Sequence, residues 1–123
     1  MREERGIITG DVIVYEHFEL WGAVSGTVKV IGGGKLYVRG KIYGDLLVEK
    51  GGRCHVYGAV SGNIIVHRGG KCIHSGIVGG NAVNHGGRLW VEQSAKVMGQ
   101  IEKHGGDTVV EDASHRRFFL GRE

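Results

Sequence analysis

Apolar residues recur at every sixth position along most of the chain. The series from residue 18 reads Phe18, Val24, Val30, Leu36, Ile42, Val48, Cys54, Val60, Val66, Cys72, Val78 and Asn84. All of its members except Asn84 are apolar. Around them apolar and polar residues alternate, as in Val28-Lys29-Val30, and this period of two is typical of strands with one buried face. The pattern therefore predicts short β-strands and argues against helices.

A longer repeat contains this short one. The phrase G-x-[IV]-x-G-x-[VIL]-x-V begins at Gly6, Gly22, Gly40 and Gly58, and weaker copies begin at Gly76 and Ala95. The copies are separated by 16, 18, 18, 18 and 19 residues, and a regular period of this length indicates a solenoid. We therefore predict an all-β, single-domain, three-sided parallel β-helix (β-solenoid) with about six rungs of roughly 18 residues over residues 1–112, followed by a tail or cap at 113–123.

Equivalent side chains of such a coil stack at the strand spacing of about 4.8 Å, so each column of the repeat becomes a ladder. Two inward ladders are expected to be apolar, namely Phe18, Leu36, Cys54, Cys72 and Leu89, and Val24, Ile42, Val60, Val78 and Val97. The third passes from Val30, Val48 and Val66 to Asn84 and Lys103. We therefore expect the regular core to weaken near residue 84.

The composition is typical of a folded chain with many tight corners. Glycine accounts for 24 of the 123 residues and proline is absent, while 41% of the residues are hydrophobic. No apolar window approaches the roughly 18 residues of a membrane span, and the first ten residues contain no apolar signal segment. We therefore expect a cytoplasmic protein without a transmembrane segment. The formal net charge of +3 is too small to indicate a specific nucleic-acid partner.

The repeat resembles that of one known family. Short strands with the phrase G-x-V-x-G-x-[VI]-x-V at a period of about 18 residues are similar to those of bactofilins, the polymer-forming cytoskeletal proteins of bacteria. The resemblance covers roughly residues 6–112. It implies a right-handed triangular β-helix that polymerises end to end without nucleotide, and it brings no catalytic motif. The doubled glycines, such as Gly51-Gly52 and Gly69-Gly70, also resemble repeats of autotransporter adhesin passengers.

Three histidines, His67, His85 and His104, fall in one outward column that begins beside Glu49. A zinc ion requires imidazoles that converge at about 2.0–2.1 Å from it. Stacked rungs point their side chains alongside one another, so we expect an exposed corner ladder and no metal site within one chain. Stoichiometric zinc in the purified protein would instead favour a metal-dependent enzyme.

Two cysteines, Cys54 and Cys72, lie on adjacent rungs of an inward ladder. Neighbouring strands bring Cα atoms close enough for a disulfide, but a buried free cysteine also packs as a small apolar residue. We favour core packing. Neither cysteine belongs to a recognisable nucleophile motif, so no catalytic residue is predicted.

Four cations, Lys35, Arg53, Lys71 and Arg88, form a column directly after the glycine doublets. Like charges about 4.8 Å apart repel by on the order of 1 kcal/mol per pair in water. The column is interpreted either as solvated charge that keeps a β-protein soluble, which we favour, or as a strip for a polyanion or acidic lipid.

Two outward faces carry candidate contact residues. One is expected to bear Trp21, Tyr37, Arg39, His55, Tyr57, Ile73 and Trp90. The other is the largely apolar column Ile13, Lys29, Leu47, Ile65, Val83 and Glu102. Aromatic side chains on a flat face stack on sugars, on bases or on a second copy of the protein, and two such strips on a slender rod favour lateral self-association.

The tail "SHRRFFLGRE" places Phe118, Phe119 and Leu120 between charges. A solenoid must either cap its last rung or offer unpaired backbone groups to another chain. The tail is therefore expected to do one or the other.

These features together predict a non-enzymatic, bactofilin-like scaffold protein without a cofactor. It is expected to self-assemble into filaments or oligomers through its solenoid ends and its apolar outer faces. The alternative is a β-helix binding module that recognises a glycan or another cell-envelope polymer through the aromatic face.

Overall fold

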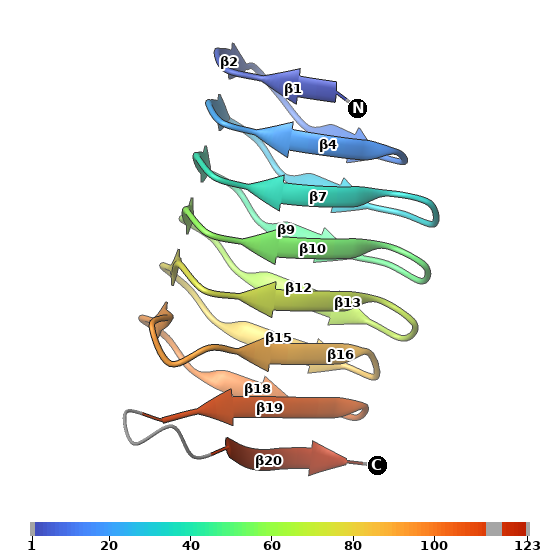
Figure 1. The fold of residues 1–123 in the computed structure, drawn as a ribbon, viewed down its shortest axis with the longest axis vertical. Helices are drawn as coiled ribbons and strands as arrows, with labels where there is room; N and C mark the ends of the chain where they lie inside the picture. The colour runs from blue at the N-terminus through green and yellow to red at the C-terminus, as the bar shows by residue number, and fades with distance from the viewer. Residues whose placement is uncertain (1, 113–116, 123) are drawn as a thin grey trace.

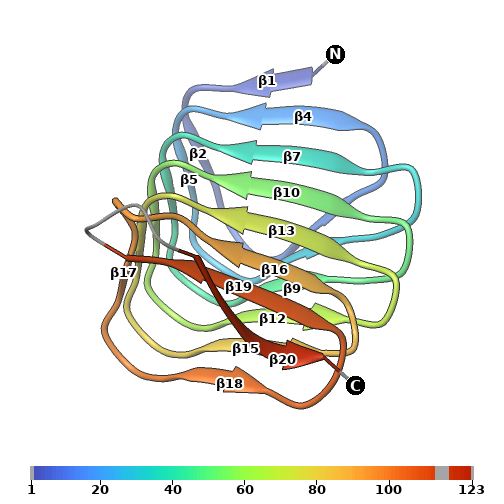
Figure 2. The ribbon, with the colours of Figure 1, turned by 60° about the horizontal axis from the view of Figure 1, so that its bottom comes forward.

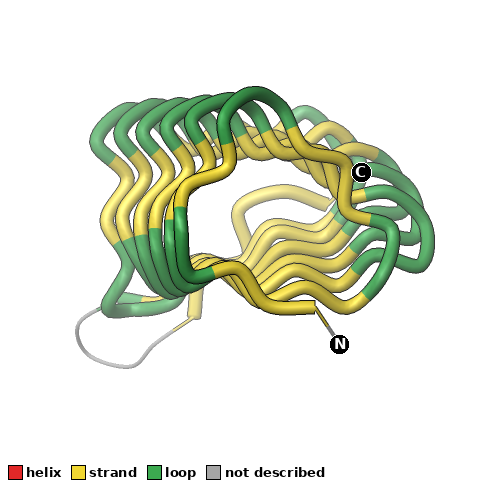
Figure 3. Tube along the Cα trace, turned by 90° about the horizontal axis from the view of Figure 1, so that it is seen from above, coloured by secondary structure: helices red, strands yellow, loops and turns green. Residues whose placement is uncertain are grey.

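The chain is a parallel β-solenoid. A computed structural model describes residues 2–112 and 117–122. Figure 1 shows the strands stacked rung upon rung from the N-terminus to the C-terminus, and Figure 3 shows the three sides of the coil in a view along the stack. The predicted fold class, a three-sided parallel solenoid with turns of about 18 residues, is confirmed.

Each side of the coil is one sheet. Sheet A contains β1 (Arg2–Glu4), β4 (His17–Leu20), β7 (Lys35–Val38), β10 (Arg53–Val56), β13 (Lys71–His74), β16 (Arg88–Val91), β19 (Asp107–Glu111) and β20 (Arg117–Arg122). Sheet B contains β2 (Ile7–Ile8), β5 (Ala23–Val24), β8 (Lys41–Ile42), β11 (Ala59–Val60), β14 (Ile77–Val78) and β17 (Lys96–Val97). Sheet C contains β3 (Val12–Val14), β6 (Val28–Val30), β9 (Leu46–Val48), β12 (Ile64–His67), β15 (Ala82–His85) and β18 (Ile101–Lys103).

The strand register is the one that the six-residue period predicts. Phe18 lies opposite Leu36, Leu36 opposite Cys54, and Cys54 opposite Cys72 in sheet A. The predicted columns of sheets B and C are paired in the same way. Because a slip of one residue would turn every inward side chain outward, the buried ladders fix this register.

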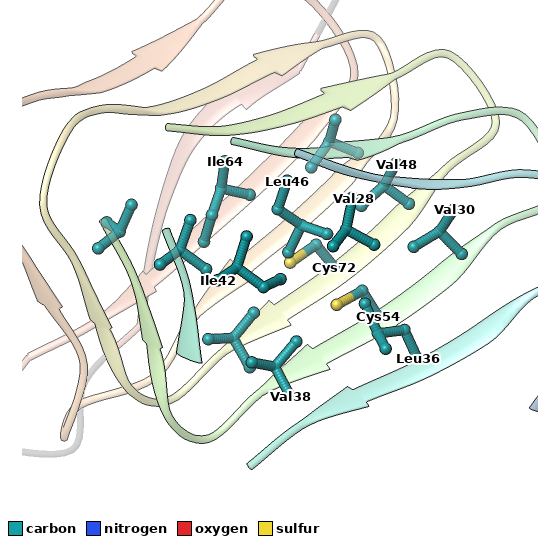
Figure 4. Close-up of a cluster of buried hydrophobic side chains, with 14 of the residues drawn as sticks. Val28, Val30, Leu36, Val38, Ile42, Leu46, Val48, Cys54, Ile64 and Cys72 are labelled. Atoms are coloured by element: carbon teal, nitrogen blue, oxygen red, sulfur yellow. The ribbon is translucent and has the colours of Figure 1, made fainter. Parts of the chain in front are cut away.

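The core fills the axis of the coil. Apolar side chains from all three sheets converge there, and Figure 4 shows Cys54 and Cys72 among Leu36, Ile42 and Leu46. Each of these five side chains is at most 5% exposed. Burying a side chain of this size contributes about 1.5–3 kcal/mol, so the repeated ladders account for most of the driving force for folding.

Glycine is required at one corner of the second to fifth rungs, at Gly22, Gly40, Gly58 and Gly76, because successive rungs touch there; in the last rung Ala95 stands at this position. A Cβ atom on Gly40 would lie 1.8 Å from the carbonyl oxygen of Gly22, and one on Gly58 would lie 2.0 Å from that of Gly40. Backbone cannot yield as a flexible side chain does. The first glycine of the repeated phrase is therefore a steric requirement of the coil.

The buried column of sheet C continues through Asn84, which is fully buried. Its side-chain nitrogen donates to the oxygens of Gly87, Asp107 and Thr108, at 3.0 to 3.1 Å. Its side-chain oxygen accepts from the backbone N–H groups of Gly86 and Gly87. Asn84 itself does not interrupt the core, because every polar group of this amide is paired. The expected weakening lies in the rung that follows. Less complete burial begins one rung later, at Val97 and Ile101.

The C-terminal segment reverses the chain. β20 runs antiparallel to β19, whereas every other paired strand is parallel among the described residues. Figure 2 shows β20 beside β19 at the C-terminal end of the coil. The register shifts between Thr108 and Val109. The outer edge of β19 is therefore covered by the chain's own backbone.

Candidate functional site

The N-terminal rung presents the edges of all three sheets. Among residues 2–112 and 117–122, β1, β2 and β3 each stand at the end of their sheet and pair on one side only, with β4, β5 and β6. In β3, the N–H of Val12 donates to the carbonyl oxygen of Thr27, and the carbonyl oxygen of Val14 accepts from the N–H of Ile31. Both partners belong to the second rung. Alternate residues of a strand point their N–H and C=O groups to opposite edges, so those of Ile13 lie on the open edge.

The same alternation holds in β2. The carbonyl oxygens of Gly6 and Ile8 accept hydrogen bonds from the second rung, so the N–H and C=O of Ile7 face the open edge. The side chains of this rung are unusually accessible. Ile7 is 75% exposed, Ile13 58% and Tyr15 60%. An uncovered strand edge that also carries exposed apolar side chains is a template for pairing with another chain.

The C-terminal end differs from the N-terminal end. β17 and β18 are the last strands of sheets B and C, while sheet A ends in the reversed strand β20. The backbone of β20 pairs Phe118 with Val110 and Phe119 with Val109. The side chains of Phe118, Phe119 and Leu120 lie outside the part of the chain whose side chains are described.

Several of the predicted aromatic-face residues gather into one cluster on sheet A, centred on Arg39. Its guanidinium carbon lies 4.9 Å from the ring centroid of Trp21 and 4.7 Å from that of Tyr57. The Tyr37 and Tyr57 rings stack at 6.5 Å, and His55 stacks on Tyr57 at 3.9 Å. These contacts use ring surface that stacking on a sugar would need. The cluster therefore already has internal partners.

Trp90 lies apart from that cluster, on β16. Its indole Nε1–H donates to Glu111 at 2.9 Å. Ile73, in register between His55 and Trp90, is half-buried. The predicted aromatic face is therefore divided into a cation-centred cluster on the early rungs and a more apolar stretch on the later ones.

The predicted apolar column of sheet C exposes less surface than its composition suggests. Leu47 and Ile65 are half-buried, and Val83 is only 8% exposed. Ile13, in the first rung, is the exposed apolar member of this column. The accessible apolar surface of this side is therefore concentrated at the N-terminal end.

The three histidines form the predicted ladder. The His67 and His85 ring centroids are 5.9 Å apart, and those of His85 and His104 are 5.1 Å apart. His67 Nε2 lies 3.5 Å from Glu49, and His104 Nε2 lies 3.1 Å from Glu102. Within the described residues, no group of three or more His, Cys, Asp or Glu side chains is arranged to hold a metal ion.

Both cysteines are free thiols in the core. They lie opposite each other in β10 and β13. Burial raises the pKa of the Cys54 thiol well above its usual value, and the hydrogen bond and charge interaction with Cys72 raise it further. Such a thiol carries little thiolate at neutral pH and is a poor nucleophile.

A polar ladder that the sequence pattern did not reveal follows the corner between sheets B and C. The side-chain oxygen of Asp45 accepts from the backbone N–H of Asn63 at 2.7 Å, and that of Asn63 accepts from Asn81 at 2.8 Å. In the same way, the side-chain oxygen of Asp11 accepts from the backbone N–H of Thr27, and that of Asn81 accepts from the backbone N–H of Gln100. The only sequence signal was a recurrent Asp, Thr or Asn directly after the second glycine of the phrase.

A buried histidine was also missed. His74 occupies the inward column of Val56 and Val91 and is fully buried. Its Nε2 lies 3.0 Å from the carbonyl oxygen of Lys96, while its Nδ1 has no hydrogen-bond partner. Burial lowers the pKa of this imidazole, and the hydrogen bond to Lys96 opposes that shift. The signal was its position two residues after the inward Cys72.

Comparisons with protein-family models, with curated proteins and with solved structures found no match. In residues 2–112 and 117–122, no helix is long and apolar enough to cross a membrane. Function is therefore inferred from the geometry of the ends and faces described above.

Proposed function

We propose that this protein is a non-enzymatic scaffold that self-assembles through the ends of its solenoid. The observation that carries the proposal is the first rung, where β2 and β3 stand at open edges with Ile7 and Ile13 exposed, while the edge of β1 carries the charges of Arg2, Glu3 and Glu4. The bactofilin-like repeat supports the same conclusion by resemblance. Natural β-proteins usually cover or charge such edges, because an uncovered edge recruits another strand.

The physical gain on assembly has two sources. Pairing of a second chain would satisfy the outward backbone groups of Ile7 and Ile13, and it would extend the stack of sheets by a further rung. It would also remove from water the side chains of Ile8 and Val12, which pack against the core and are only partly buried. Burial of apolar surface contributes about 25 cal/mol for each Å².

The two ends offer different surfaces to a partner. The N-terminal end offers three parallel strand edges, while at the C-terminal end the edge of β19 is taken by β20. Within the described residues, β17, β18 and β20 also stand at the ends of their sheets, so the two ends differ in strand direction: only the C-terminal end closes sheet A with a strand antiparallel to its neighbour. Lateral contact through Leu47 and Ile65 has less accessible apolar surface to offer.

The test is sedimentation of the untagged protein over a range of concentrations, with negative-stain electron microscopy of the same samples. We expect a species larger than the monomer whose share rises with concentration and which persists at high salt. A monomer at every concentration would overturn the proposal. Filaments and discrete oligomers would both support assembly, and their images would show which ends are joined.

The exposed isoleucines provide a matched pair of variants for the same assay. Ile7→Ser with Ile13→Thr removes apolar surface from the first rung, while Ile77→Ser removes an exposed isoleucine from β14 of sheet B, a strand that is paired on both sides. We expect the changes in the first rung to weaken assembly and Ile77→Ser to leave it unaltered. Equal effects would mean that the first rung is not the contact surface.

A further inference from the structure

The cationic column of sheet A runs without interruption over four rungs. Lys35 lies opposite Arg53, Arg53 opposite Lys71, and Lys71 opposite Arg88. All four side chains are exposed. None of them forms an ion pair with any acid of residues 2–112.

Such a column opposes folding rather than assisting it. Neighbouring charges about 4.8 Å apart repel by on the order of 1 kcal/mol per pair in water. The nearby acids offset this repulsion only at Arg88, which has Asp107 as its neighbour on the next rung. Glu49 pairs with His67, and Asp107 follows Arg88 in the register and ends the positive stretch. Glu92 lies beside His55, at 3.8 Å.

Two further cations stand on the other side of the glycine doublets. Lys50 and Arg68 directly precede these doublets and are exposed. Gly69, whose φ is 81°, leaves room for the Lys50 side chain. A Cβ atom on Gly69 would lie 2.8 Å from the Cγ of Lys50. The corner between sheets C and A therefore carries positive charge on both of its sides.

The surface is hollowed on each side of the column. A hollow of about 380 Å³ follows the glycine corner beside Arg53, Lys71 and Arg88. On the sheet A side, a hollow of about 450 Å³ lies between Lys71, Arg88, Ile73 and Trp90, and its lining also includes the carboxylates of Glu92 and Asp107. A smaller one of about 140 Å³ continues it toward Arg53 and Lys35. The cations are thus flanked by a furrow with an apolar wall.

We propose that this furrow binds an extended acidic polysaccharide, one whose sugars carry carboxylates. The rung spacing of about 4.8 Å is close to the length that one pyranose residue adds to an extended glycan. Because neighbouring sugars of an extended glycan face opposite sides, the carboxylates on one side recur at every second sugar and can meet every second cation of the column. The apolar wall of Ile73 and Trp90 suits the C–H face of a sugar ring, because aromatic and aliphatic side chains pack on such faces.

Other polyanions match the furrow less well. Duplex DNA carries one charge per about 1.7 Å of its axis, which is much denser than one cation per rung. Polyphosphate has no apolar surface for Ile73 and Trp90. Single-stranded nucleic acid is recognised largely by base stacking on aromatic rings, and the Tyr37 and Tyr57 rings already stack on each other.

The test uses the full chain and a fluorescent oligogalacturonate as the probe. Binding is followed by anisotropy at low and at moderate salt, with a neutral chitin oligosaccharide, polyphosphate and single-stranded DNA as competitors. The variant is Arg53→Gln with Lys71→Gln, in the centre of the column. The matched control is Lys29→Gln with Lys96→Gln, which removes the same charge from exposed positions on sheets C and B.

We expect the oligogalacturonate to bind, and its affinity to fall with rising salt because counterions are released on binding. The column variant should bind about tenfold more weakly and with a shallower salt dependence, whereas the control should match the parent. All three proteins are compared at concentrations at which sedimentation shows the same oligomer. The positions changed are exposed, and thermal unfolding verifies that each variant is folded.

Three results would overturn the proposal. The first is the absence of saturable binding to the oligogalacturonate at low salt. The second is an equal loss of affinity in the column variant and in the control, which would indicate an effect of net charge alone. The third is tighter binding of polyphosphate or single-stranded DNA than of the acidic sugar.

Discussion

Replacing His74 with valine should remove a large part of the pH dependence of stability. His74 is fully buried between Val56 and Val91 in the core of sheet A. Its Nε2–H donates to the carbonyl oxygen of Lys96, so the unpartnered Nδ1 is the atom that a second proton would occupy. Charging the imidazole there would place an unpaired cation in an apolar interior.

The sign follows from the lowered pKa of His74. In the unfolded chain the imidazole binds a proton at its ordinary pKa of about 6.5, while the folded protein keeps it neutral to a lower pH. The unfolded state therefore binds more protons as the pH falls below that value. Stability is fully present above the unfolded pKa and is lost as the pH falls toward the folded pKa, by up to about 1.4 kcal/mol per pH unit.

The valine variant should be close to the parent protein in stability at alkaline pH. It loses the hydrogen bond to Lys96 and also removes the unpartnered Nδ1, and these two effects are opposite in sign and each on the order of 1 kcal/mol. As the pH falls from about 8 to about 5, the variant should become progressively more stable than the parent.

The assay is urea unfolding of both proteins at a series of pH values. The difference between their unfolding free energies isolates His74. His55, whose pKa is also lowered, chiefly by burial, contributes equally to both proteins. Two parallel curves over this pH range would refute the reasoning, since they would mean that the folded protein protonates His74 as readily as the unfolded chain does.

Three further substitutions or reactions probe the interior and the corners. Asn84→Val should destabilise the protein by about 3 kcal/mol or more, because buried partners in the last turns lose their hydrogen bonds. This loss is expected even though valine restores an apolar residue to the column. Urea unfolding measures the change, and an unchanged midpoint would contradict it. Asn63→Ala should cost about 1 kcal/mol in the same assay, because the backbone N–H of Asn81 loses its acceptor, and no loss would show that water replaces the side chain. Cys54 and Cys72 should be unreactive toward a thiol reagent in the native protein and react on unfolding, since both are buried; native reaction at the rate of an exposed thiol would be the contrary result.

The strand register could be predicted from sequence because burial determines it. Leu36, Cys54 and Cys72 are in the predicted column and lie at most 5% exposed. A periodic apolar signal of this kind survives in a single sequence because each inward position must repeat on every rung. The glycines of the phrase repeat for a related reason, since backbone from the preceding rung occupies the place of a Cβ atom.

The polar features could not be predicted in the same way. Asn84 was expected to interrupt the core, but its partners lie on the next rung and in the following turn, and no sequence pattern names them. The ladder through Asp45 and Asn63 uses residues that are common in any turn, so only the stacked corners show that they bond to one another. The open edges of the first rung follow from which strand stands at the end of each sheet, and the repeat pattern alone does not state this.

The measurement that tests self-assembly most directly is sedimentation of a variant with proline at both outward positions of the first rung, Ile7→Pro and Ile13→Pro. Proline removes the backbone N–H that faces the open edge and leaves the bonds of Gly6, Ile8, Val12 and Val14 to the second rung in place. The control, Ile7→Thr with Ile13→Thr, keeps both N–H groups. If strand edges form the joint, the proline variant is folded and monomeric, while the threonine variant still assembles in part. Assembly of the proline variant at the level of the parent protein would contradict the account.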